Sequence, residues 1–135
     1  MTITGHVVVL GEPDRATREI YQRALCAAFE VIPAPDEHTV LNVLHQRQIR
    51  ALVLEPMIFS DRGWEQLGVV SRACTERGIA LIVCSTLDER RRGIELGAAA
   101  YLVKPTLPAT LLGSVQQVIG REGAEHGGAA TEYTG

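Results

Sequence analysis

Three polar side chains in this chain stand at the ends of apolar runs and could together perform phosphate chemistry. They are Glu55 after residues 51–54, Ser85 after residues 80–84 and Lys104 after residues 99–103. Short apolar runs rich in branched residues are typical of buried parallel strands, whose carboxyl ends meet at one edge of a sheet. We therefore expect the three side chains to converge on one pocket. There a carboxylate could act as nucleophile while a hydroxyl and an ammonium bind phosphoryl oxygens.

The apolar pattern around these residues predicts that strands and helices alternate five times. Strands are expected over 6–10, 29–32, 49–54, 80–84 and 99–103. One helix is expected to begin at 12–14 and another at Asp36, and three more are expected over 64–76, 88–96 and 108–119. Such alternation predicts a doubly wound (βα)5 α/β fold, a flavodoxin-like three-layer sandwich with a parallel five-stranded sheet of order 2-1-3-4-5. We expect one domain over residues 1–121 and a disordered tail over 122–135, where small and polar residues have nothing to bury.

Composition narrows the classes of function. The chain has 135 residues and a formal net charge of −3, so no basic surplus indicates direct binding of nucleic acid. Three cysteines lack metal-type spacing, and we expect them to be reduced and to fill the core. Because no apolar run reaches the roughly 20 residues of a membrane helix and no signal peptide is apparent, we expect a cytoplasmic protein with no membrane contact.

A longer pattern lies at residues 95–105, Glu-Leu-Gly-Ala-Ala-Ala-Tyr-Leu-Val-Lys-Pro. With 12–14 and 61–65, it makes residues 7–119 resemble the receiver domain of bacterial two-component response regulators. The resemblance implies that an aspartate after the third strand accepts phosphate from a histidine kinase and that an acidic pair after the first strand holds Mg²⁺. It also implies a switch and phosphate pocket at Ser85, Thr86, Tyr101 and Lys104.

The departures from that family pattern fall where the chemistry takes place. Glu55 stands at the phospho-acceptor position, and Leu10 and Gly11 stand where the acidic pair should be, which leaves Glu12 as a weak metal candidate. Mg²⁺ requires oxygen ligands. Glutamate is also about 1.5 Å longer than aspartate, and about 1 Å of misplacement can cost on the order of 100-fold in rate. We therefore expect no cofactor, weak or lost Mg²⁺ binding, and little or no phosphorylation.

We interpret the chain as an atypical receiver, or pseudo-receiver, that transmits signals by protein contact and is not an enzyme. The resemblance implies contact with a histidine kinase or a downstream effector through residues 88–96, 99–103 and 108–119, or with a second copy in a homodimer. Glu55 either bonds Lys104 and Ser85 and turns Tyr101 inward, as a fixed substitute for phosphate, or merely neutralises Lys104. The alternatives are a working receiver phosphorylated by a histidine kinase and, more remotely, a ligand-binding flavodoxin-like protein.

Overall fold

The computed structural model describes residues 5–124 and has the predicted alternation of strands and helices. The elements are β1 Val7–Gly11, α1 Arg15–Leu25, β2 Glu30–Ala34, α2 Glu37–Gln46, β3 Ala51–Leu54, the 3₁₀ segment η1 Pro56–Arg62, α3 Gly63–Arg77, β4 Ala80–Ser85, α4 Arg90–Glu95, β5 Ala100–Val103 and α5 Pro108–Ala124. All strand pairs are parallel, and the order β2-β1-β3-β4-β5 confirms the predicted sheet.

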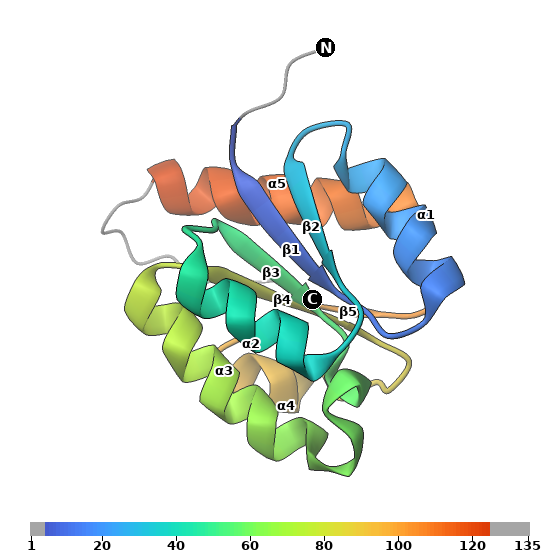
Figure 1. The fold of residues 1–135 in the computed structure, drawn as a ribbon, viewed down its shortest axis with the longest axis vertical. Helices are drawn as coiled ribbons and strands as arrows, with labels where there is room; N and C mark the ends of the chain where they lie inside the picture. Colours follow the sequence, from blue (N-terminus) through green and yellow to red (C-terminus); the bar gives the residue numbers. More distant parts are fainter. Residues whose placement is uncertain (1–4, 125–135) are drawn as a thin grey trace.

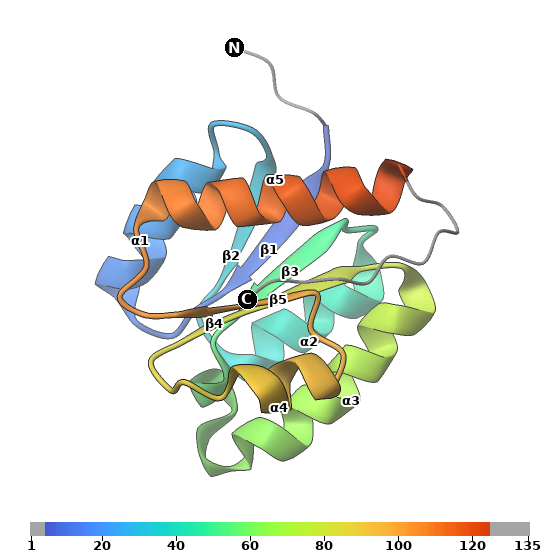
Figure 2. The same ribbon diagram turned by 180° about the vertical axis from the view of Figure 1, so that it is seen from behind.

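Helices cover both faces of this sheet. Figure 1 and Figure 2 show α1 and α5 together on one face, with α2, α3 and α4 on the other. Successive strand residues point to opposite faces, so Val8 and Leu10 join the core beneath α1 and α5, while Val9 joins the core beneath α2 and α3. The central strands β3 and β4 are buried along their whole length, as their unbroken apolar runs require.

Caps and breaks set where the helices begin and end. Asp36 caps α2 as predicted, because its carboxylate accepts the Thr39 backbone N–H. Asp14 caps α1 in the same way, so that helix begins at Arg15, one residue after the expected opening at 12–14. Helix α4 is shorter than the expected 88–96: it runs from Arg90 to Glu95, and its N-cap residue Glu89 makes no side-chain capping hydrogen bond. The Asp88 carboxylate instead binds the Arg90 side chain.

Three other expectations need correction. Strand β2 continues through Pro33, which is tolerated because β2 lies at the sheet edge and pairs only with β1. Cys74 and Cys84 are buried as core residues, but Cys26, just beyond α1, is exposed. Helix α5 continues to Ala124, past the expected helix end at 119. Residues 125–135 of the expected tail lie outside the described residues. No helix within residues 5–124 is long and apolar enough to cross a membrane.

The segment after β3 is a kinked 3₁₀ turn where the sequence predicted a plain loop. Its kink falls at the exposed Ser60, whose φ is 57° and ψ is −133°. This positive φ is sparsely populated for residues with a Cβ, and holding a residue there costs about 1–3 kcal/mol. Glycine adopts the same conformation without that steric cost.

We predict that Ser60→Gly raises the free energy of unfolding by about 1 kcal/mol, since relief of the positive φ outweighs the greater entropy of an unfolded glycine. Urea denaturation measures the change. The control is Ser114→Gly within α5, which is expected to lower stability by about 0.5 kcal/mol through helix propensity alone. Equal losses in both variants would contradict the interpretation of the kink.

Candidate functional site

Strand register places two carboxylates side by side at the carboxyl end of the sheet. Gly11 of β1 is paired with Leu54 of β3, so the next residue on each strand is a glutamate, Glu12 and Glu55. The Glu55 N–H donates to the Gly11 carbonyl at 2.9 Å, which fixes this pairing beyond the last ladder residues. Both glutamates are buried, with 3% and 4% of their surface exposed. Burial of two neighbouring carboxylates requires a cation to compensate them.

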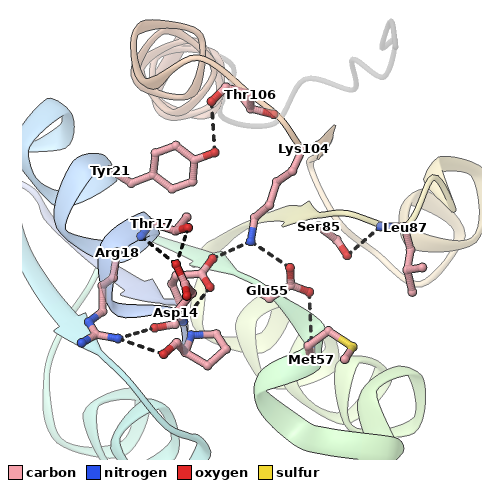
Figure 3. A network of polar contacts seen from close by, with 12 residues as sticks. Asp14, Thr17, Arg18, Tyr21, Glu55, Met57, Ser85, Leu87, Lys104 and Thr106 are labelled. Atoms are coloured by element: carbon pink, nitrogen blue, oxygen red, sulfur yellow. Dashed lines mark hydrogen bonds and ion pairs between the residues drawn. The ribbon is translucent and has the colours of Figure 1, made fainter.

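Lys104 supplies that cation from the end of β5. Its backbone N–H donates to the Ser85 carbonyl at 2.7 Å, which positions it one residue beyond the β4–β5 ladder, and its peptide bond to Pro105 is cis. Its Nζ atom donates to Glu12 Oε1 at 2.6 Å and to Glu55 Oε1 at 2.9 Å. Figure 3 shows the Lys104 side chain extending toward Glu55. We call Lys104, Glu12 and Glu55 the Lys104 cluster.

The remaining carboxylate oxygens of the Lys104 cluster are also occupied. Glu12 Oε2 accepts the Asp14 N–H at 3.0 Å, and Glu55 Oε2 accepts the Met57 N–H at 3.1 Å. Burial lowers the pKa of Lys104, but the hydrogen bonds and charges of the two carboxylates outweigh it and raise that pKa above its ordinary value. Each carboxylate oxygen of this network therefore already has a donor, and one ammonium is shared by two carboxylates.

The donor set does not fit the Mg²⁺ that the receiver resemblance implies. The carboxylates of Glu12 and Glu55 bind the lysine, and Leu10 has an apolar side chain buried in the core. An acid in place of Gly11 would place its Cβ 2.9 Å from Leu54 Cδ1, so the Leu54 side chain would have to shift to admit one. Within residues 5–124, no group of three or more His, Cys, Asp or Glu residues is arranged to hold a metal ion. The weak metal candidate Glu12 is instead a partner of Lys104.

Ser85 and Thr86 lie near the Lys104 cluster but outside its hydrogen bonds. Ser85 is buried at the end of β4, and its Oγ accepts the Leu87 N–H at 3.2 Å. No hydrogen bond described in residues 5–124 joins Ser85 to Glu55, which corrects the expectation that Glu55 would bond both Ser85 and Lys104. Thr86 is exposed and lines a groove beside Lys104 with a volume of about 430 Å³.

Tyr101 lies inward, beneath α4. It is buried, and its hydroxyl donates to the Leu87 carbonyl at 2.7 Å. Burial raises the pKa of Tyr101, so the ring stays neutral. Gly93 makes room for this ring, because a Cβ at that position would lie 2.3 Å from Tyr101 Cδ2. The glycine that weakens α4 as a helix is thus what allows α4 to pack on the inward tyrosine.

Tyr21 and Cys84 close the site on the side of α1 and α5. The Tyr21 hydroxyl donates to the Thr106 carbonyl at 3.0 Å, and burial together with the neighbouring Cys84 raises the pKa of Tyr21 to about 12. Burial likewise raises the pKa of the Cys84 thiol. A buried thiol that holds its proton is a poor nucleophile, so these residues pack the site and add no reactive group.

Sequence reasoning located Glu55, Ser85, Tyr101 and Lys104 at this edge but undervalued Glu12. The missed signal was the position of Glu12 directly after a strand. In a parallel sheet, acids that follow two neighbouring strands come together when the last residues of those strands are paired with each other. Register was not assigned from the sequence, so Glu12 could not be matched to Glu55. Met57 and Leu87 contribute to the site through backbone groups, so their side-chain types could not have identified them.

Comparisons with known proteins agree with this architecture. No protein-family model matches the chain. It is 29% identical over 118 residues to "Probable transcriptional regulator ycf27" of Galdieria sulphuraria, an alignment that covers 84% of this chain and 45% of that protein. It is 30% identical over 110 residues to "Transcriptional regulatory protein HprR" of Escherichia coli K12, covering 81% and 49%. The chain thus spans about half the length of these relatives.

Solved structures show the same fold. A response regulator from Thermotoga maritima superposes with a TM-score of 0.72 at 23% identity, covering 86% of this chain and 98% of that one. The CheY-like response regulator receiver domain protein from Methanospirillum hungatei JF-1 gives a TM-score of 0.77 at 19% identity, covering 90% and 99%. The chain therefore has the CheY-like receiver-domain fold of response regulators.

Lys104→Met tests the contribution of the buried ammonium to stability. Removing the ammonium leaves two buried carboxylates without a cation, so we expect the free energy of unfolding to fall by about 3–5 kcal/mol. The control is Arg15→Met, which breaks the exposed Arg15–Glu19 ion pair at 3.1 Å and should cost about 0.5 kcal/mol. Urea denaturation at pH 7 separates the two, and similar small losses would contradict the ionic role of Lys104.

The difference between wild type and Lys104→Met should also depend on pH. Because the folded pKa of Lys104 is raised, its contribution is fully present below the ordinary lysine value of 10.5 and is lost as pH rises through the higher folded pKa. We expect a constant difference in stability from pH 7 to 9 that shrinks above about pH 10.5. A difference that grows with alkaline pH would contradict this sign.

A further prediction concerns the packing of Gly93 on Tyr101. Gly93→Ala should displace the ring or α4 and lower stability by about 1–3 kcal/mol, as overpacking does. Trp64, the single tryptophan, reports the movement, since Arg92 of α4 stacks 4.5 Å from its ring centroid. Gly113→Ala on α5, where a Cβ meets nothing within 4 Å, should leave Trp64 fluorescence unchanged and slightly stabilise the helix. Unchanged fluorescence and stability in Gly93→Ala would refute the packing role.

Proposed function

We propose that this chain is an atypical receiver domain that acts in signal transduction by protein contact, without phosphorylation, and not as a conventional enzyme. The receiver fold and the similarity to halves of transcriptional regulators support a signalling role. Each of those regulators is about twice as long as the matched region, so the role of the whole protein is part of the proposal.

The observation that carries this proposal is the ammonium of Lys104 bound to both Glu12 and Glu55. An incoming phosphodonor is anionic, and phosphoryl transfer depends on a cation that neutralises charge between donor and acceptor. Here the ammonium is already held by two carboxylates at 2.6 and 2.9 Å. A phosphodonor would meet two acids whose cation is already bound, so the barrier to transfer is not lowered.

Glu55 then has a structural role in signalling. It occupies the position of a phospho-acceptor, keeps Lys104 inward and anchors the start of η1 through the Met57 N–H. Tyr101 is inward at the same time, held by the Leu87 carbonyl. We interpret this combination of Lys104 and Tyr101 as one fixed conformation of the receiver switch. In it, the permanent carboxylate of Glu55 replaces a phosphate that would be added and removed reversibly. Glu55 reaches Lys104 but not Ser85, so the substitution for phosphate is partial.

The proposed contact surface is the face formed by α4, β5 and α5. Strand β5 is a sheet edge, and a cavity of about 460 Å³ along β5 and α5 is lined by small residues such as Ala99, Gly113 and Ser114. Small residues allow another backbone to approach closely. A histidine kinase, a downstream effector or a second copy of the chain are the partners that the receiver resemblance implies for this face.

The experiment is to incubate the protein with a small phosphodonor such as acetyl phosphate and Mg²⁺ and to weigh it intact. We expect no phosphoryl adduct on the wild type. We also expect none on Glu55→Asp, because the acidic pair at Leu10 and Gly11 is absent and Glu12 retains Lys104. A receiver with an intact aspartate and acidic pair, treated in parallel, must become phosphorylated for the result to count.

A stoichiometric adduct that disappears in Glu55→Gln would contradict the proposal and identify a working receiver that uses glutamate. An adduct on Glu55→Asp alone would show that the length of the acid, and not the lack of metal ligands, blocks transfer. That result would also contradict the proposed role of the Lys104 cluster in preventing phosphorylation.

A further inference from the structure

A cavity of about 410 Å³ opens at the amino end of the sheet, at the pole opposite the Lys104 cluster. Its walls come from the start of β1, the loop between α2 and β3, and the turn between α3 and β4. Arg47, Arg50 and Arg77 all line it, and no Asp or Glu of residues 5–121, whose side chains the structure describes, does so. The chain as a whole carries a net charge of −3, so this concentration of guanidinium groups does not reflect a generally basic protein. We call it the amino-end cavity.

The contacts of these arginines leave much of their charge uncompensated. Arg47 pairs with Glu30 at 3.2 Å, and both side chains are largely exposed. Arg77 donates to the Leu44 carbonyl, and Arg50 Nη2 donates to the Ile119 carbonyl at 3.4 Å, while Arg50 Nε is buried without a hydrogen-bond partner. Among the side chains of residues 5–121, neither Arg50 nor Arg77 forms an ion pair with a carboxylate.

Helix capping explains the position of two of these residues but not the charge of the whole group. Arg47 is the C-cap of α2 and Arg77 is the last residue of α3, where a cation offsets the helix dipole. Each helix end contributes only about half a negative charge. Counting the side chains of residues 5–121, two helix ends and Glu30 offset about two of the three guanidinium charges, which leaves about one positive charge facing a concave surface.

We propose that the amino-end cavity binds a small ligand through a phosphate group. Arginine presents a planar fork of N–H donors that matches phosphate oxygens in pairs, and such charge-assisted bonds are among the strongest in proteins. A cavity of about 410 Å³ falls in the range of small-ligand sites. Its concave shape and its three arginines suit a single phosphate group better than an extended nucleic-acid backbone, which needs a longer basic stripe.

Binding would link parts of the chain that are distant in sequence. The walls of the cavity connect the C-terminal ends of α2 and α3, and Arg50 joins them to the carbonyl of Ile119 in α5. A phosphate bound there would neutralise the excess charge and hold these ends together. The site lies apart from the Lys104 cluster, so it does not depend on whether Glu55 can be phosphorylated.

The test is calorimetric titration of the full chain with inorganic phosphate and, separately, with adenosine monophosphate, against sodium chloride of equal ionic strength. We expect saturable binding of at least one. Arg47→Gln should weaken that binding about tenfold or more, since one charge-assisted pair is lost. The matched control is Arg15→Gln, which also removes an exposed arginine from a glutamate pair, at 3.1 Å, but lies on α1; its affinity should equal that of the wild type.

If inorganic phosphate and adenosine monophosphate bind with equal affinity, the site recognises the phosphate group alone. If adenosine monophosphate binds more tightly, the site recognises a phosphate ester. Either supports the proposal if Arg47→Gln weakens it selectively. Absence of binding by both ligands, or equal weakening by Arg47→Gln and Arg15→Gln, would overturn it.

Discussion

A single buried ammonium between two buried carboxylates is the interaction on which the carboxyl end of this molecule depends. Lys104 is bound to Glu12 at 2.6 Å and to Glu55 at 2.9 Å, with little exposure of any of the three side chains. Removing charges from water costs several kcal/mol for each ion, and only close geometry with further hydrogen bonds repays that cost. The cluster achieves this because β1 and β3 end side by side and Lys104 follows the neighbouring end of β5. Backbone N–H groups donate to the second oxygen of each carboxylate.

The same cluster is the basis for the proposal that this receiver-like fold works without phosphorylation. A phosphoryl site needs a cation that is free to act on an incoming anion. In this chain the lysine is bound to two carboxylates, Leu10 faces the core, and a side chain at Gly11 would need Leu54 and Val40 to shift. Under the proposed function, the lack of acids at positions 10 and 11 and the Glu12–Lys104 pair together keep Lys104 and Glu55 in one arrangement.

Most of the fold could be predicted from the sequence because apolar runs, caps and glycines act locally. The runs at β3 and β4 and the cap at Asp36 lie where their patterns place them. Strand register depends on packing between distant segments, and without it the pairing of Glu12 with Glu55 stayed hidden. Cys26 shows the same limit in another way, since the sequence could not tell that the residue after α1 would face solvent.

The measurement that tests the central claim most directly is a crystal structure of the protein grown or soaked with millimolar Mg²⁺. We predict that Lys104 Nζ remains within hydrogen-bond distance of both Glu12 and Glu55, and that no ordered cation lies between those carboxylates. An octahedral Mg²⁺ bound by Glu12 and Glu55, with Lys104 turned away, would contradict the claim. That result would show that the ion pair is only the resting arrangement of a functional metal site.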